Sequence, residues 1–431
     1  MNKQKLFVFC LDALCSSDIE YMKTLKNFST IFETGSYVEH VEPVYPSITY
    51  VCHTSIITGK YPMNHGVNQN EKVARGKLHS PWFTMKNDVQ ADTLLDIAAR
   101  NGLTTCSISW PVSGGANYDL NMPMIVPYMY KGYQPEQFLE NTASAELLEK
   151  YFWNHGRYIK GEDRSLDLFT MALAPDIIRD YEQPDVMLVK MCDLDTIRHN
   201  YGVYHEKTKE QLRKHDEEFG VLLESIKRYG DFDNTNFIIL GDHGQTDVDL
   251  VLNFNVLLKQ HGFLRLNEDG SLQDYDALCH SNGLSAWIEL KDPNDVAMKQ
   301  KVHEFLLSLK EDPEINLRYI FTKEEAEIQF KLTGPFDFVI EGEGAISFNE
   351  DWSGDRIFGK KKRGDKKIGE GSHGGLPHKK ETTTFIASGP AIKPGVVVDK
   401  GLMVDEAVTM AYMLGLEMKD TDGNLIKEIL R

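Results

Sequence analysis

Short apolar runs that end in acidic or histidine residues constrain the fold of this chain more than any other feature. The run Asn236–Leu240 leads through a glycine into Asp242 and His243, and Lys5–Leu11 leads into Asp12. Short β-rich runs of this kind are typical of strands. Ligands of open α/β sheets gather beyond the carboxyl ends of the strands. The side chains that follow the runs are therefore expected at one edge of one sheet.

A third run and a glycine-flanked histidine extend the pattern. The run Asp185–Cys192 is followed by Asp195 and His199, which are four residues apart, so one turn of helix would place both on the same face. His373 precedes the strand-like segment Thr382–Ala387. Three acids and three histidines thus stand at positions suited to a divalent metal, which takes oxygen and nitrogen donors. An isolated Asp-His pair would indicate only a solvated turn.

Strand-like and helix-like segments alternate along most of the chain. This alternation predicts an α/β fold with a mostly parallel central sheet sandwiched by helices. A chain of 431 residues exceeds the usual size of a single core, so one large domain with a smaller inserted one is expected. Residues 1–254 and 369–431 are expected to form the metal-binding core.

Two stretches depart from the alternation. Residues from about 115 to 180 have a helical and aromatic composition, with Tyr128, Tyr130 and Tyr133 close together, and are expected to form a helical excursion over one edge of the sheet. Residues 255–368 shift in composition again. They are expected to form a smaller inserted α+β cap.

Charge and composition exclude some partners. The net charge is −18, with 65 acidic and 47 basic side chains, which opposes loose binding to polymeric nucleic acid or to an anionic membrane. The six cysteines form no CxxC pair and are expected to be reduced. The chain has neither a signal-peptide core nor an apolar run of membrane-spanning length, so a cytoplasmic location is expected. The sequence does not indicate the oligomeric state.

A basic run at residues 360–367 has two interpretations. Such a run is most often a solvated, mobile turn, and this is the expectation here. The alternative is an anion-attracting lip beside the site, because His373 follows closely.

The segment at residues 43–59 holds the candidate nucleophile. Its two prolines favour an extended approach, and Cys52–Thr58 can form a helix. Thr49 would then lie near a helix N-terminus, where backbone N–H groups and the dipole favour an anionic oxygen or a phosphate. A threonine hydroxyl is a weak nucleophile until it is ionised, and a metal ion can ionise it. The local sequence is equally compatible with Thr49 acting only as an N-cap.

The order of these motifs resembles that in the alkaline phosphatase superfamily. Within it, the motifs are similar to those of the nucleotide pyrophosphatase/phosphodiesterase branch, with features shared by phosphonoacetate hydrolase. The resemblance spans nearly the whole core and is weak across the excursion and the insertion. The motifs are Asp12, the segment around Thr49, Tyr61–Val67, Trp110–Pro111, Asp195–His199 with Gly202, Gly241–Gly244 and His373–Gly375.

The resemblance implies two metal sites and a covalent mechanism. Zinc is the implied ion, and Asp and His ligands also accept manganese or iron. Thr49 would attack phosphorus and form a phosphothreonine intermediate, with the two ions clamping the attacking and leaving oxygens. One site would be formed by Asp12, Thr49, Asp242 and His243, and the other by Asp195, His199 and His373.

The resemblance also implies roles for residues near the nucleophile. Asn70 matches a position whose side-chain amide holds a phosphoryl oxygen, and the backbone N–H of Tyr50 could do the same. The ring of Tyr50 matches an aromatic that stacks on a base, and packing into the core is its alternative. His53 and His65 are expected to be structural. His378 is the alternative to the glycine-flanked histidine as a ligand.

Departures from the family pattern bear on the substrate. The His373–Pro377 segment is more similar to the phosphonoacetate hydrolase version, and Arg198 replaces a common glycine. No arginine occurs before Arg75, so no guanidinium near Thr49 is ready to clamp a doubly charged monoester. A diester is therefore favoured.

The expected function is a two-metal hydrolase that cleaves a phosphodiester or pyrophosphate bond of a small phosphorylated substrate, with a nucleotide as the leading example. One alternative is hydrolysis of the carbon–phosphorus bond of a phosphonate. Another is a metal-stabilised binding protein with a degenerate site. A sulfatase is disfavoured, because Thr49 stands where such enzymes need a cysteine or serine.

Overall fold

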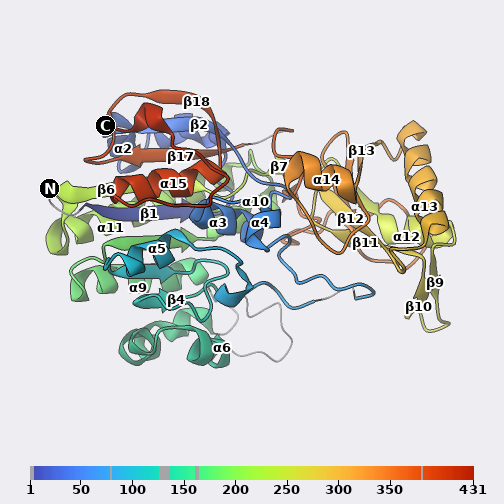
Figure 1. Cartoon of the computed structure of the whole chain (residues 1–431), viewed down its shortest axis with the longest axis horizontal. Helices are drawn as coiled ribbons and strands as arrows, with labels where there is room; N and C mark the ends of the chain where they lie inside the picture. The colour runs from blue at the N-terminus through green and yellow to red at the C-terminus, as the bar shows by residue number, and fades with distance from the viewer. Residues whose placement is uncertain (1–3, 78–79, 126–134, 161–164, 380–381) are drawn as a thin grey trace.

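An eight-stranded sheet lies at the centre of the larger of two lobes in the computed structural model (Figure 1). The structure describes residues 4–77, 80–125, 135–160, 165–379 and 382–431. The strands of this sheet are β1 Lys5–Leu11, β2 Ser36–Glu42, β3 Thr105–Ile108, β4 Leu120–Met122, β5 Val186–Met191, β6 Thr235–Gly241, β17 Thr383–Ser388 and β18 Val397–Leu402. They lie in the order β18-β2-β17-β6-β1-β5-β3-β4, and neighbours are parallel except where β17 meets β2 and β6. The expected α/β fold with a mostly parallel sheet is confirmed.

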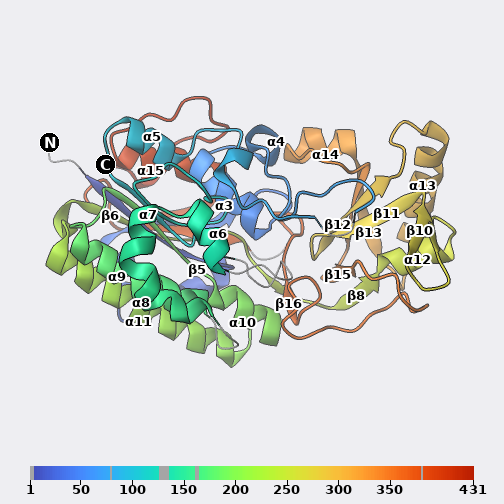
Figure 2. The ribbon, with the colours of Figure 1, turned by 90° about the horizontal axis from the view of Figure 1, so that it is seen from below.

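Strand β1 shows why helices cover both faces of the sheet. Leu6, Val8 and Cys10 are fully buried in one core, and the residues between them are fully buried in the other. Successive side chains of a strand point to opposite faces, so a run that is apolar at every position needs cover on both sides. One core includes α3 Thr49–Thr58, α5 Leu94–Arg100 and α15 Val404–Met413, and the other includes α9 Leu166–Asp180 and α11 Glu206–Tyr229, which lie side by side in Figure 2.

The excursion at residues 115–180 is not purely helical, contrary to expectation. It contains β4, the edge strand of the large sheet, which pairs in parallel with β3. Three residues are too few to show the period of a strand, and for this reason the sequence did not reveal it. The cluster of Tyr128, Tyr130 and Tyr133 lies outside the described residues. The helices of the excursion before α9 are α6 Pro135–Thr142, α7 Ala145–Leu147 and α8 Trp153–His155.

A four-stranded antiparallel sheet forms the smaller lobe, which is yellow and orange in Figure 1. Its strands are β11 Ala277–Ser281, β12 Ser285–Leu290, β13 Leu317–Thr322 and β14 Phe338–Gly342, and its helices are α12 Phe254–Gln260, α13 Val296–Ser308 and α14 Lys323–Phe330. The strands lie in the order β11-β12-β14-β13. The cap boundaries at 254/255 and 368/369 stay predictions.

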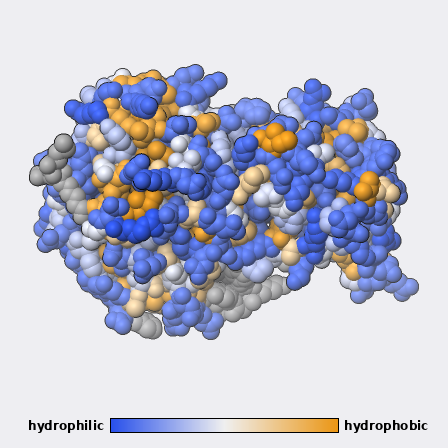
Figure 3. Space-filling model, in the orientation of Figure 1, coloured by the Kyte–Doolittle hydropathy of each residue, from blue (hydrophilic) through white to orange (hydrophobic). Residues whose placement is uncertain are grey.

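The surface in Figure 3 is mostly hydrophilic, and apolar residues gather over the larger lobe. Val397 and Leu402 of β18 and Tyr412 of α15 are among the exposed apolar side chains. No helix within the described ranges is long and apolar enough to span a bilayer.

Glu406 of α15 is a buried carboxyl whose oxygens have no hydrogen-bond partner among the described residues. Burial raises its pKa well above the usual value, and the nearby carboxylates of Asp405 and Asp242 add to the effect. Above the pKa of an unfolded glutamate, about 4.3, the folded protein therefore binds more protons than the unfolded chain, so stability falls as pH rises. We expect Glu406→Gln to stabilise the fold at about pH 8 by about 1–3 kcal/mol.

Thermal unfolding measured at several pH values tests this prediction. The gain in Tm should shrink as pH falls toward the ordinary glutamate value. Glu417→Gln, a change at an exposed glutamate, is the matched control and should leave Tm unchanged. A gain from Glu406→Gln that is the same at every pH would contradict the assignment.

Candidate active site

Six predicted donor side chains converge beyond the carboxyl ends of β1, β5 and β6. All six are buried: Asp12, Asp195, His199, Asp242, His243 and His373. Donor atoms of Asp12, Asp242 and His243 lie within 4.8 Å of one another, and so do those of Asp195, His243 and His373. The Nε2 atom of His199 lies 3.0 Å from Asp195 Oδ1, next to the second group. The structure therefore brings the six side chains to one place, with His243 shared by both groups.

The carboxylates each point one oxygen toward this group. Asp242 Oδ1 accepts hydrogen bonds from the N–H groups of Ala13, at 2.9 Å, and His243, at 3.0 Å, so Oδ2 is left 3.3 Å from His243 Nε2. Asp12 Oδ1 lies 3.4 Å from the same nitrogen. Asp12 Oδ1, Asp242 Oδ2 and His199 Nε2 form no hydrogen bond within the described residues. Buried polar atoms are normally paired, so crowded donor atoms without bonds fit a bound cation.

The three histidines share one hydrogen-bonding pattern. The Nδ1 atoms of His199, His243 and His373 lie 2.8, 3.2 and 3.3 Å from the carbonyl oxygens of Gly371, Gly244 and Ser47. A carbonyl only accepts, so each Nδ1 carries the proton and each Nε2 offers a lone pair, as metal-binding histidines do. Burial lowers the pKa of His243 and His373, which keeps both imidazoles neutral and able to bind a metal.

Thr49 is the first residue of α3, which begins three residues earlier than the sequence predicted. The N-cap is Ile48, so Thr49 does not cap the helix and that alternative is wrong. Its Oγ1 lies 3.2 Å from His243 Nε2. The hydroxyl is therefore within reach of the donor group, at the positive end of a helix.

Asn70 and Tyr50 lie beside the nucleophile, and the backbone N–H of Tyr50 is occupied. The Tyr50 N–H donates to Asn70 Oδ1 at 3.0 Å, so this N–H is not open to a phosphoryl oxygen, whereas the bond orients the amide of Asn70. The ring of Tyr50 is only 1% exposed and meets Trp82 edge-on at 5.0 Å. Every side chain of α3 is buried, and Tyr50 is also among the residues that line the cavity, so its stacking role stays a prediction.

A cavity of about 820 Å³ opens at the donor groups, which is large enough for a small organic ligand. One part of its wall is apolar and includes Trp82, Met124, Ile159 and Leu166. Another part is basic. Trp82 was not singled out from the sequence, because a lone tryptophan in a loop carries no positional signal.

The basic loop at 360–367 contributes that wall. Residues 360–364 are exposed, as expected of a solvated turn, whereas Lys366 and Lys367 are partly buried beside the site, as the alternative of a basic lip predicted. Lys366 Nζ lies 2.7 Å from Asp195 Oδ2, and Lys362 and Lys367 line the same cavity. The loop is held in place partly by Arg363, which lies over the ring of Tyr201. The run of basic residues before His373 was the available signal, but composition does not say which side chains point inward.

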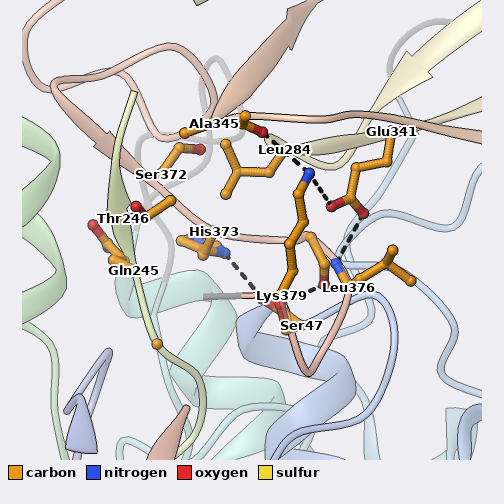
Figure 4. Close-up of a pocket in the computed structure, with 13 residues that line it drawn as sticks. Ser47, Gln245, Thr246, Leu284, Glu341, Ala345, Ser372, His373, Leu376 and Lys379 are labelled. Carbon is orange, nitrogen blue, oxygen red and sulfur yellow. Dashed lines mark hydrogen bonds and ion pairs between the residues drawn. The ribbon is translucent and has the colours of Figure 1, made fainter. Parts of the chain in front are cut away.

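The loop that carries His373 is bonded to both lobes (Figure 4). The Ser47 hydroxyl, beside the nucleophile, donates to the Gly375 carbonyl at 3.0 Å. Glu341 of β14 accepts from the N–H of Leu376 at 2.8 Å and pairs with Lys379 at 2.8 Å. The position of His373 therefore depends on contacts from both sides.

Other predicted or noted residues lie outside the donor groups. His65 Nε2 lies 3.0 Å from Ser55 Oγ, away from the site, and His53 Nδ1 lies 3.2 Å from Asp242 Oδ2, behind it. His378 is exposed, which rules it out as the alternative to His373. Arg198 is fully buried and forms two hydrogen bonds with Asp18, so the replacement of a glycine there supports the fold and does not line the cavity.

Comparisons with known proteins agree with this geometry. The family model described as Type I phosphodiesterase / nucleotide pyrophosphatase matches residues 6–376. Ectonucleotide pyrophosphatase/phosphodiesterase family member 7 of Mus musculus is 24% identical over 434 residues, covering 94% of this chain and 82% of that protein. Family member 3 of Bos taurus is 24% identical over 251 residues, covering 56% of this chain and 24% of that protein.

Solved structures share the fold. Murine ectonucleotide pyrophosphatase / phosphodiesterase 5, in an inactive form in complex with AMP, superimposes with a TM-score of 0.68 at 18% sequence identity and covers 100% of both chains. The human protein of the same name has a TM-score of 0.68 at 18% identity, covering 99% of this chain and 100% of that chain.

Proposed function

The chain belongs to the type I phosphodiesterase and nucleotide pyrophosphatase family, whose members are phosphoric ester hydrolases, and we propose that it cleaves a phosphodiester or pyrophosphate bond of a small nucleotide-like substrate. One observation carries the proposal: the Thr49 hydroxyl lies 3.2 Å from His243 Nε2, beside two groups of buried metal donors that border one cavity. The hydroxyl is the nucleophile of this proposal.

The donor set fits two divalent cations. We assign Asp12, Thr49, Asp242 and His243 to one ion and Asp195, His199 and His373 to the other. Nitrogen and oxygen donors of this kind suit zinc, and manganese is the alternative. When bound, such ions act as Lewis acids and lower the pKa of a coordinated hydroxyl.

Thr49 and the groups around its hydroxyl have separate roles in the reaction. Thr49 Oγ1 forms a bond to phosphorus as the bond to the leaving oxygen breaks. The threonine then carries the phosphoryl group with its remaining ester substituent, and attack by water on this phosphorus restores the threonine hydroxyl and releases a phosphate monoester. The N-terminus of α3 favours the anionic oxygen. The amide nitrogen of Asn70 donates to a non-bridging phosphoryl oxygen.

The cavity wall favours a diester over a monoester. No arginine lines the cavity in the described part of the chain, so no guanidinium is present for bidentate binding of a dianionic phosphate. Trp82 and Tyr50 both line the cavity, and Trp82 offers an apolar surface for an organic group on the phosphate. The AMP bound to murine family member 5 is consistent with a nucleotide.

A substrate panel tests the proposal. Purified protein is assayed with a chromogenic nucleotide diester, a chromogenic monoester and phosphonoacetate, each with and without a chelator. We expect the diester to be preferred by at least about tenfold, which is about 1.4 kcal/mol of transition-state binding, and activity to return when zinc is added back. Free phosphate from phosphonoacetate would instead favour the carbon–phosphorus reaction. Bound ions without any turnover would favour a binding protein.

A cytoplasmic location stays a prediction. It is supported by the six cysteines, none of which forms a disulfide bond within the described residues.

A further inference from the structure

Lys190 is a fully buried lysine in the central strand β5, where it pairs in register with Cys10 of β1. Its Nζ lies 2.6 Å from Asp12 Oδ2, and the sulfur atoms of Cys192 and Met124 are 3.2 and 3.6 Å away. Burial of an ammonium group is unfavourable unless a carboxylate pairs with it. Within the described residues, Asp12 makes the only ion pair with Lys190.

This contact gives the two carboxylate oxygens of Asp12 different surroundings. Oδ2 is bonded to Lys190, whereas Oδ1 has no hydrogen-bond partner among the described residues and lies 3.4 Å from His243 Nε2. Lys190 therefore orients Asp12 so that a single oxygen faces the donor group. A contact to the oxygen that faces away from the metal fixes the orientation of a carboxylate ligand.

The other carboxylates have their second oxygens bonded differently. Asp242 Oδ1 takes two backbone N–H groups, which carry no net charge. Asp195 Oδ2 pairs with Lys366, whose side chain is 37% exposed and so partly screened by water. Lys190, at 0% exposure, holds a full positive charge in the interior directly behind the nucleophile's site.

We propose that Lys190 is a positioning residue that keeps Asp12 bound to a cation through one oxygen and adds a fixed positive charge to the first metal site. The inference rests on the proposed function. The charge has two opposite consequences. It opposes the binding of a cation to Asp12, and it stabilises the ionised Thr49 and the anionic transition state, because charges interact strongly in a water-excluded site.

Removal of the charge should therefore tighten metal binding and slow the reaction. We expect Lys190→Met to bind zinc about tenfold more tightly and to lower kcat for the nucleotide diester by about 10- to 100-fold with little change in KM, the usual range for residues behind a metal ligand. Zinc affinity is measured on the stripped full-length chain by competition with a chromogenic chelator. This measurement needs no turnover.

Two further variants separate the effect of the Lys190 charge from the effect of its hydrogen bond to Asp12 and from the loss of any lysine ion pair in the sheet. Lys190→Gln keeps an N–H donor for Asp12 Oδ2 without the charge, so it should bind zinc at least as tightly as Lys190→Met and lose less kcat, and it replaces that variant if Lys190→Met does not fold. Lys5→Met is the matched control, because Lys5 pairs with Asp185 at 3.2 Å at the other end of the same sheet. It should leave zinc affinity and kcat unchanged.

Weaker zinc binding together with lower kcat would show that Lys190 only supports the fold, and would overturn the proposal. Unchanged zinc affinity in both Lys190 variants would overturn it as well. If the wild-type chain hydrolyses no substrate of the panel, the proposed function fails, but the zinc measurement still decides whether Lys190 opposes the cation.

Discussion

Thr49→Ala is expected to lose hydrolysis of the nucleotide diester, by more than about 1,000-fold in kcat, while zinc content stays close to that of the wild type. The reason is that the side-chain oxygen is the attacking atom, and it lies 3.2 Å from His243 Nε2 at the donor group. Three buried acids and three histidines remain to hold the ions. Steady-state kinetics and metal analysis of the purified variant measure both quantities.

Two controls make this prediction specific. Thr58→Ala removes another buried hydroxyl from the same helix, where Thr58 bonds only the Thr54 carbonyl at 2.7 Å, and it should keep wild-type kcat. Thr49→Ser keeps the oxygen and should retain measurable turnover. Acid quenching of the wild-type reaction should trap on Thr49 the phosphoryl group with its remaining ester substituent. Turnover by the alanine variant would remove the threonine from the mechanism.

His243→Ala is expected to lose both bound zinc and activity, again by more than about 1,000-fold in kcat. His243 belongs to both groups of close donor atoms, so its loss removes a ligand of the first metal site and a neighbour of the second. Its Nε2 also lies 3.2 Å from the Thr49 hydroxyl. Metal content, measured after dialysis against metal-free buffer, should fall below the two ions proposed for the wild type.

His378→Ala is the matched control for this change. His378 follows His373 by five residues and is exposed, so its loss should leave metal content and kcat unaltered. A normal zinc content in His243→Ala would contradict the assignment of His243 as a ligand.

The sequence predicted the sheet and the convergence of donor residues for one physical reason. Parallel strands end at one edge, so Asp12, Asp195 and Asp242, each placed after an apolar run, had to come together. His373 lies before a strand and not after one, so its flanking glycines made it a candidate, and the resemblance to a family then assigned it to a metal site.

Features that depend on side-chain direction were not predictable. Tyr50 follows the nucleophile in sequence, but its direction is set by helix α3, which packs every side chain inward. Lys366 pairs with Asp195 across 171 residues of sequence, and such a contact leaves no local pattern. Lys190 looked like one polar residue in an apolar run, and its partner became visible only when β1 and β5 lay side by side.

The hydrogen bonds that hold the His373 loop to both lobes limit how the substrate specificity of this enzyme can change. Ser285 of the smaller lobe donates to the Gly374 carbonyl at 2.6 Å, and Glu341 of the same lobe accepts from Leu376. A mutation that tilts the cap to admit a new substrate would therefore also move a metal ligand. Changes of specificity are therefore expected at residues of the cavity wall that leave these two anchors in place.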